Sequence, residues 1–190
     1  MYTIKTTYNS LKTDELIRNY YDVEKIENFC KQCENYNKIW SCPPYEFNTE
    51  KYVRQFENIH IIGTQIVFDE NVIEEIKAKE DIKEFSTKTI LKERKQVFEK
   101  LLLLENEYPH SKAINSGNCS ICKQCTRVNN EKCINESLIR YSLESLGFDV
   151  GKIAKEILGI ELKWSSEALP EYLTMVSGFM TNYDIKDIKL

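Results

Sequence analysis

The clearest strand of the chain is the stretch Ile-His-Ile-Ile-Gly-Thr-Gln-Ile-Val-Phe at residues 59–68. Isoleucine, valine and phenylalanine fill six of its ten positions, and residues of these types favour strands. Gly63 interrupts the apolar residues, so we expect a β-bulge there. This strand is the starting point for predicting the elements on either side of it.

Helices and further strands are expected before and after this strand. The strongest helix prediction is 86–107, where apolar residues recur near helical spacing and Pro109 follows the end. Other helices are predicted at 13–20, 49–56 (capped by Asn48), 72–79, 135–146 (closed by Gly147) and 150–158 (closed by Gly159). Further strands are predicted at 21–26, 111–116 and 172–183, the last being either one strand or a bent pair around Gly178.

The order of these elements indicates the fold class. Helices and strands intermix without the regular spacing of βαβ units, which favours an α+β fold with a small, largely antiparallel sheet. No low-complexity linker divides the chain. We therefore predict a single domain over residues 1–190, with helices packed on the sheet and two cysteine-rich metal-binding loops.

Composition narrows the classes of function. The chain has 190 residues, 42% of them hydrophobic and 29% charged, as in ordinary globular proteins. Its net charge of −4 and pI near 5.4 argue against nucleic acid as the main partner, because phosphate-binding surfaces usually need a basic excess.

The longest apolar run, Leu101–Leu104, is far shorter than the roughly 18 residues that a membrane span needs. The first residues also lack the features of a signal peptide. We therefore expect a cytoplasmic protein without a membrane partner. Thiols stay reduced in that compartment, so clustered cysteines indicate metal ligands or redox groups rather than disulfides.

The later of two cysteine groups carries the strongest chemical signal. Three cysteines recur at intervals of three residues and a fourth follows after seven more, and this second cysteine group is Cys119, Cys122, Cys125 and Cys133. Such a loop can wrap a compact inorganic core, and bacterial [4Fe–4S] sites begin with the same C-x2-C-x2-C pattern. Structural zinc more often takes two separated C-x2-C pairs. The spacing therefore favours a [4Fe–4S] cluster, with zinc as the alternative.

Basic residues accompany the second cysteine group. Lys123, Arg127 and Lys132 would offset the negative charge of a cluster, but we expect them mainly on a solvated surface. Arg140 follows on a predicted helix, where a surface salt bridge is expected and contact with an anionic substrate is the alternative.

The earlier group has three cysteines in a C-x2-C-x8-C-P-P pattern, and this first cysteine group is Cys30, Cys33 and Cys42. Pro43 holds the preceding residue extended, which directs the Cys42 sulfur. The aromatic residues Tyr36, Trp40 and Tyr45 are expected to pack beneath the loop.

One coordination position of the first cysteine group is left over. A water or substrate would make the site reactive. A side chain such as His60, His110, an Asp or a Glu is the second alternative, although both histidines are expected to be structural. In the third, the groups interleave: Cys42 joins Cys119, Cys122 and Cys125, while Cys133 joins Cys30 and Cys33.

Three pieces of the sequence are distinctive together. They are Cys-Glu-Asn-Tyr-Asn-Lys-Ile-Trp-Ser-Cys-Pro-Pro-Tyr at 33–45, Gly-Asn-Cys-Ser-Ile-Cys-Lys-Gln-Cys at 117–125, and the segment from Cys133 through Arg140 to Val150. This combination resembles a family of cysteine-rich predicted metal-binding proteins that is common in anaerobic bacteria and archaea. The resemblance implies metal binding by the seven cysteines. Family members often have Arg and Pro after the last cysteine, whereas Ile134 and Asn135 follow here.

These observations predict an iron–sulfur protein for electron transfer or a small redox reaction. The second cysteine group would hold a [4Fe–4S] cluster, and the first would hold a second metal site. A redox partner protein, or a small-molecule ligand at the open position, is the expected partner. The alternatives are a zinc-stabilised adaptor without catalysis and a carrier of metal or sulfur.

Overall fold

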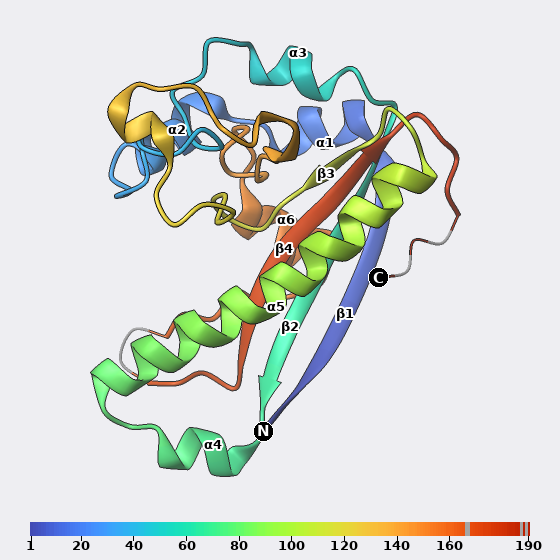
Figure 1. Cartoon of the computed structure of the whole chain (residues 1–190). Helices are drawn as coiled ribbons and strands as arrows, with labels where there is room; N and C mark the ends of the chain where they lie inside the picture. The colour runs from blue at the N-terminus through green and yellow to red at the C-terminus, as the bar shows by residue number, and fades with distance from the viewer. Residues whose placement is uncertain (166–167, 187, 189) are drawn as a thin grey trace.

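The structure is a computed structural model that describes residues 1–165, 168–186, 188 and 190 (Figure 1). Its strands are β1 (Tyr2–Lys12), β2 (Asn58–Phe68), β3 (Lys112–Ile114) and β4 (Tyr172–Thr181). Its helices are α1 (Thr13–Tyr20), α2 (Val23–Cys30), α3 (Thr49–Val53), α4 (Glu70–Glu75), α5 (Lys79–Glu107) and α6 (Val150–Glu156). Two short 3₁₀ helices are η1 (Thr126–Asn129) and η2 (Glu136–Leu138). The α+β prediction is confirmed, and the cysteines lie in or beside loops.

The four strands form one antiparallel sheet in the order β1-β2-β4-β3. The stretch predicted from its apolar residues is β2, which pairs with β1 on one side and β4 on the other. Apolar side chains on both faces of β2 are buried: Ile59 and Ile61 pack with α1 and α6, whereas Ile62 packs with α5. Coverage of both faces explains why this strand is the easiest to predict from sequence.

Strand β2 has no bulge at Gly63, and the segment predicted at 172–183 is the single strand β4 rather than the alternative, a bent pair around Gly178. Both strands pair without interruption, with Gly63 opposite Val176 in the β2–β4 pair. The glycines instead make room for neighbours. A Cβ at Gly63 would lie 2.8 Å from side-chain carbons of Leu158 and Ile160, and one at Gly178 would lie 2.8 Å from the carbonyl oxygen of His60.

Two predicted elements close to the cysteines are also wrong. The strand predicted at 21–26 is helix α2, because the Asp22 side chain accepts a hydrogen bond from the Lys25 backbone N–H and caps a helix. The helix predicted at 135–146 is a short 3₁₀ helix followed by turns. Ser145 Oγ accepts from the Ser142 backbone N–H at 3.0 Å, and such side-chain bonds compete with helical ones.

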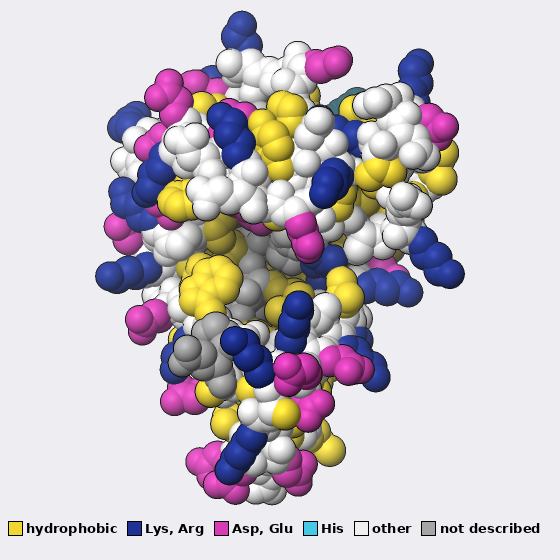
Figure 2. All heavy atoms as spheres, turned by 90° about the vertical axis from the view of Figure 1, so that its left-hand side faces the viewer, with side chains coloured by type: hydrophobic (Ala, Val, Ile, Leu, Met, Phe, Trp, Pro, Cys, Tyr) yellow, Lys and Arg dark blue, Asp and Glu magenta, His cyan; other side chains and the backbone are white. Residues whose placement is uncertain are grey.

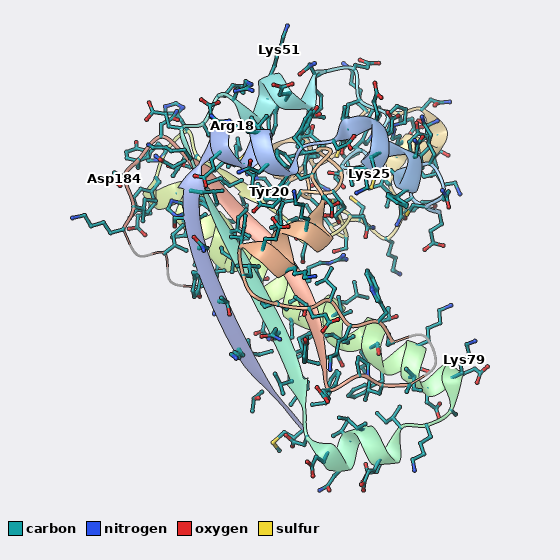
Figure 3. The ribbon with its side chains drawn as sticks, turned by 180° about the vertical axis from the view of Figure 1, so that it is seen from behind. Arg18, Tyr20, Lys25, Lys51, Lys79 and Asp184 are labelled. Atoms are coloured by element: carbon teal, nitrogen blue, oxygen red, sulfur yellow. The ribbon has the colours of Figure 1, made fainter. Side chains whose placement is uncertain are left out.

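Two long segments form a lobe at one end of the sheet: 23–53, which holds the first cysteine group, and 117–147, which holds the second. They lie side by side in Figure 1. Lys25 of α2 pairs with Asp149 at 2.8 Å and so ties the lobe to α6, while Lys79 marks the opposite end of the molecule (Figure 3). Among the described residues, no helix combines the length and apolar character needed to cross a membrane.

Candidate metal centre

All seven cysteines are free thiols, and they gather in the lobe in two sets. The thiols of Cys122, Cys125 and Cys133 lie close enough to Cys119 for their charges to act on its pKa. In the same way, Cys30 and Cys33 act on Cys42. The structure thus brings the thiols together in the two groups that are also separate in sequence, rather than in an interleaved arrangement.

The second cysteine group surrounds one cavity. All four of its cysteines line a space of about 310 Å³, together with parts of the first loop such as Trp40 and Ser41. Burial raises the pKa of the Cys119 thiol, a hydrogen bond from the Ile121 backbone N–H opposes this, and the neighbouring thiolates add to it. The four half-buried cysteines therefore border one common cavity.

Asn135 joins two thiols of this group. Its side-chain Nδ2 donates to Cys122 Sγ at 3.2 Å, and its backbone N–H donates to Cys133 Sγ at 3.4 Å. Hydrogen bonds to cysteine sulfurs stabilise thiolates and tune metal centres. Asn135 therefore links Cys122 to the last cysteine of the group, Cys133.

The thiols of the first cysteine group differ in exposure. Cys33 is exposed, whereas burial raises the pKa of Cys30 to about 11 and that of Cys42 to about 12. A hydrogen bond with Ser41 opposes the shift at Cys42, while the charge of Glu144 adds to the shift at both thiols. Cys30 and Cys42 are therefore protonated at neutral pH until a cation displaces the protons.

Arg127 connects the loop of the second cysteine group to the loop of the first through hydrogen bonds. It is buried, and its guanidinium donates to three carbonyl oxygens of the first loop: those of Ile39 at 2.9 Å, Cys42 at 2.5 Å and Pro44 at 2.6 Å. The guanidinium also lies 4.9 Å from the centre of the Trp40 ring. The expectation of a solvated surface is therefore wrong for Arg127, whereas Lys123 and Lys132 are exposed as expected.

Two smaller contacts strengthen the same junction. The Cys119 backbone N–H donates to Ser41 Oγ at 2.8 Å, and Trp40 Nε1 donates to the Glu131 carbonyl oxygen at 3.1 Å. The aromatic residues of the first loop are thus more than packing. Tyr36, for example, donates to Glu27 at 3.1 Å. A change in one loop will reach the other through these bonds.

Sequence reasoning missed two charged residues beneath the loops, Arg94 and Glu144. Arg94 is buried on α5, and its Nη1 lies 3.4 Å from the Ser116 carbonyl oxygen and from Asn118 Oδ1. Burial lowers the pKa of Arg94, and the charges of Cys119 and Glu144 oppose that shift. A signal existed, because Arg94 stands four residues after Ile90 on the apolar stripe of the helix.

Arg140 forms a salt bridge, but the bridge is buried rather than on the surface. Its Nε and Nη2 each lie 2.5 Å from an oxygen of Glu105 on α5, and its Nη1 donates to the Ser137 and Ile139 carbonyl oxygens at 2.8 Å. Glu105 also accepts from the Ala113 backbone N–H at 2.6 Å. Arg140 therefore fixes the chain that leaves the second cysteine group.

The two histidines stand apart from the cysteines. His60 is buried in β2, and its Nδ1 lies 2.6 Å from Ser10 Oγ on the edge strand. His110 lines a cavity with Tyr52 and Glu105 that includes no cysteine. Neither is placed as the missing ligand of the first cysteine group.

The thiols are not drawn tightly around a single point. Across 1–165, 168–186, 188 and 190, no three side chains of His, Cys, Asp or Glu are arranged to hold one metal ion. Tetrahedral zinc with bonds of about 2.3 Å would need sulfurs only about 3.8 Å apart. The second cysteine group instead spreads its four thiols around a cavity.

Comparison with known proteins gives one match. The model of a family described as "Predicted metal-binding protein (DUF2284)" matches residues 17–180. The chain belongs to this family. The match spans both cysteine groups, Arg94, Arg127 and Glu144, and it confirms the family resemblance of the sequence pieces. The DUF2284 description extends to metal binding and names no metal. No curated protein and no solved structure matches the chain.

Proposed function

We propose that this DUF2284 protein carries an iron–sulfur cluster on the second cysteine group and acts in electron transfer or a small redox reaction. The observation that carries the proposal is the arrangement of four thiols around one cavity of about 310 Å³. Each thiolate of a [4Fe–4S] cluster binds a different iron, so the sulfurs stay farther apart than around a single ion. Four thiols that line one cavity, in the C-x2-C-x2-C spacing of bacterial cluster sites, support this reading over zinc.

The chemistry of the surroundings also supports a cluster. Bound there, a cluster would supply a one-electron redox centre, and the chain would set its potential through hydrogen bonds and charge. Asn135 donates to two sulfurs, and the buried cation Arg94 lies near Cys119. Both favour thiolate over thiol, which is the state that metal binding requires.

We also propose a second metal site at the first cysteine group, and it is the better candidate for ligand chemistry. Cys30 and Cys33 line a cavity of about 760 Å³ between the lobe and the sheet. Its walls are mostly apolar and include Ile90, Met175 and Trp164. Figure 2 shows this face, where the molecule is hollowed between its upper and lower parts and hydrophobic side chains line the hollow. A space of this size suits a small molecule.

Purification without oxygen tests the proposal. The protein is expected to be brown and to contain iron and acid-labile sulfide in equal amounts, about four of each for one [4Fe–4S] cluster. A colourless protein with one or two zinc ions and no sulfide would contradict the proposal of a cluster and favour the zinc-stabilised adaptor. Metal that a mild chelator removes within minutes, without unfolding, would instead favour a carrier.

A further inference from the structure

The carboxylate of Glu144 faces the incomplete ligand set of the first cysteine group. Glu144 and Cys30 together line two cavities, one of about 230 Å³ and the larger one of about 760 Å³. Cys33 also lines the larger cavity. The charge of Glu144 acts on the pKa of both Cys30 and Cys42, so Glu144 lies beside the first cysteine group by its charge as well as by the cavities that it shares with Cys30 and Cys33.

Glu144 has no salt-bridge partner among the residues that the structure describes. Burial raises its pKa, and hydrogen bonds from its own backbone N–H, the Ser142 hydroxyl and the Gly117 backbone N–H oppose that shift. The charge of Arg94 also opposes it, but Arg94 makes no ion pair with the carboxylate. A carboxylate buried without a paired cation is costly, so such groups are usually paired or coordinate a metal.

We infer that Glu144 supplies the fourth protein ligand of the metal site whose other ligands are Cys30, Cys33 and Cys42. The inference rests on the second metal site proposed above, and it names the ligand that the three cysteines lack. Both histidines lie elsewhere, so a carboxylate oxygen takes the position that an imidazole often fills. A cation would draw the three thiols and the carboxylate together from the spread arrangement of the metal-free lobe.

A carboxylate ligand changes what the site does. Three thiolates and one oxygen give an unlike fourth position, where the oxygen is the ligand that an incoming molecule displaces most easily. Glu144 borders the large apolar cavity, so displacement would expose the metal to that space. The position is therefore closed at rest and opens to a ligand.

Glu144 also has a competing structural role, because its carboxylate accepts hydrogen bonds within the turn and from Gly117. Glu144→Gln separates the two roles. A glutamine keeps an acceptor oxygen for those bonds but is a poor metal ligand, since it carries no negative charge. Glu144→Asp keeps the charge on a shorter side chain. The matched control is Glu27→Gln, because Glu27 is likewise half-buried and lines a cavity with Cys30, but its carboxylate accepts a hydrogen bond from Tyr36.

The experiment titrates full-length, metal-free protein with Co²⁺ and follows the thiolate-to-cobalt absorption. All proteins carry Cys119→Ala, Cys122→Ala, Cys125→Ala and Cys133→Ala, which leaves the thiols of the first cysteine group as the ones that can bind Co²⁺. We expect Glu144→Gln to weaken Co²⁺ binding about tenfold or more and to change the ligand-field bands, and Glu144→Asp to restore part of both. Glu27→Gln should stay within about twofold of the parent that lacks the four thiols of the second group.

Unchanged affinity and bands in Glu144→Gln would overturn the inference, as would a parent that binds no Co²⁺ through thiolates. Should the parent without the second group's thiols fail to fold, the same variants are compared in the otherwise wild-type chain, counting the Co²⁺ bound besides iron. The cluster proposal fails separately, when anaerobic wild-type protein contains no iron or sulfide.

Discussion

The two cysteine groups have similar C-x2-C openings but opposite surroundings. The second group lies near a buried cation, Arg94, and receives two hydrogen bonds to sulfur from Asn135. The first group lies beside an acid, Glu144, and its buried thiols have raised pKa values. Burial raises thiol pKa values in both groups, at Cys119 as well as at Cys30 and Cys42, but the second loop adds a nearby cation and two hydrogen bonds to sulfur, whereas the first adds the charge of an acid. Cysteine spacing alone does not reveal this difference.

The largest effect that this comparison predicts is in thiol reactivity. In metal-free protein at pH 8, pKa values of about 11 and about 12 leave Cys30 and Cys42 almost wholly protonated. Iodoacetamide attacks thiolates, so these two should react roughly 100-fold and 1,000-fold more slowly than a thiol of pKa near 9. Their rates should rise about tenfold per pH unit up to their own pKa values.

Peptide mass spectrometry after timed alkylation measures these rates site by site. The exposed thiol of Cys33 belongs to the same loop and is the internal control, and it should be modified first. Alkylation of Cys42 as fast as Cys33 at pH 8 would contradict the burial of the first group. Metal reconstitution should protect all three.

The next effect concerns the junction that makes the two groups depend on each other. Arg127→Ala removes a guanidinium that binds three carbonyl oxygens, and it should lower the free energy of unfolding by about 3 kcal/mol. Metal should also leave both groups faster when a chelator is added. Lys123→Ala is the control, because Lys123 is exposed in the same loop and should change stability by less than about 0.5 kcal/mol.

Urea unfolding and chelator kinetics measure the two consequences of Arg127→Ala. Equal stability of the Arg127→Ala and Lys123→Ala variants would show that the loops do not hold each other. Loss of metal from one group alone would show that the groups are independent despite the bonds between them.

The smallest effect is at the base of the first loop. Asp149 caps α6 by accepting from the Lys152 backbone N–H, and Lys25 of α2 donates to it at 2.8 Å. Hydrogen bonding to Lys25, the backbone bond from Lys152 and the charges of both lysines hold the pKa of Asp149 below its usual value. Asp149→Ala should lower stability by about 1 kcal/mol at pH 7.

The pH dependence of that loss follows from the direction of the shift. A carboxyl whose folded pKa is lowered contributes stability that is fully present above its unfolded pKa, near 4, and is lost as pH falls through the folded value. The gap between wild type and Asp149→Ala should therefore shrink between pH 5 and pH 2 in urea unfolding. A gap that grows on acidification would contradict the assignment.

Burial pattern explains which elements could be predicted. Strand β2 is covered on both faces, so its apolar residues identify it. Strand β1 was not predicted, because Tyr2–Lys12 is an edge strand with mostly exposed, polar side chains and little apolar alternation. Around the cysteines, local hydrogen bonds from Asp22, Ser142 and Ser145 determine the backbone, and periodicity does not report them.

The candidate site is likewise only partly predictable from the sequence. The seven cysteines are evident from their spacing, and their two groups stay separate in space. The roles of Arg127 and Glu144 depend on contacts between residues more than 80 and 100 positions apart in the chain. Such contacts cannot be predicted from a single sequence, because each of these charged residues by itself resembles an ordinary surface charge.

The central claim is that the second cysteine group holds an iron–sulfur cluster and that the first group is a separate site. Iron and acid-labile sulfide should be counted in wild type, Cys125→Ala and Cys33→Ala, all purified without oxygen. The account predicts about four iron and four sulfide in wild type, the same in Cys33→Ala, and their loss in Cys125→Ala. Zinc without sulfide in wild type, or equal loss of iron from both variants, would contradict it.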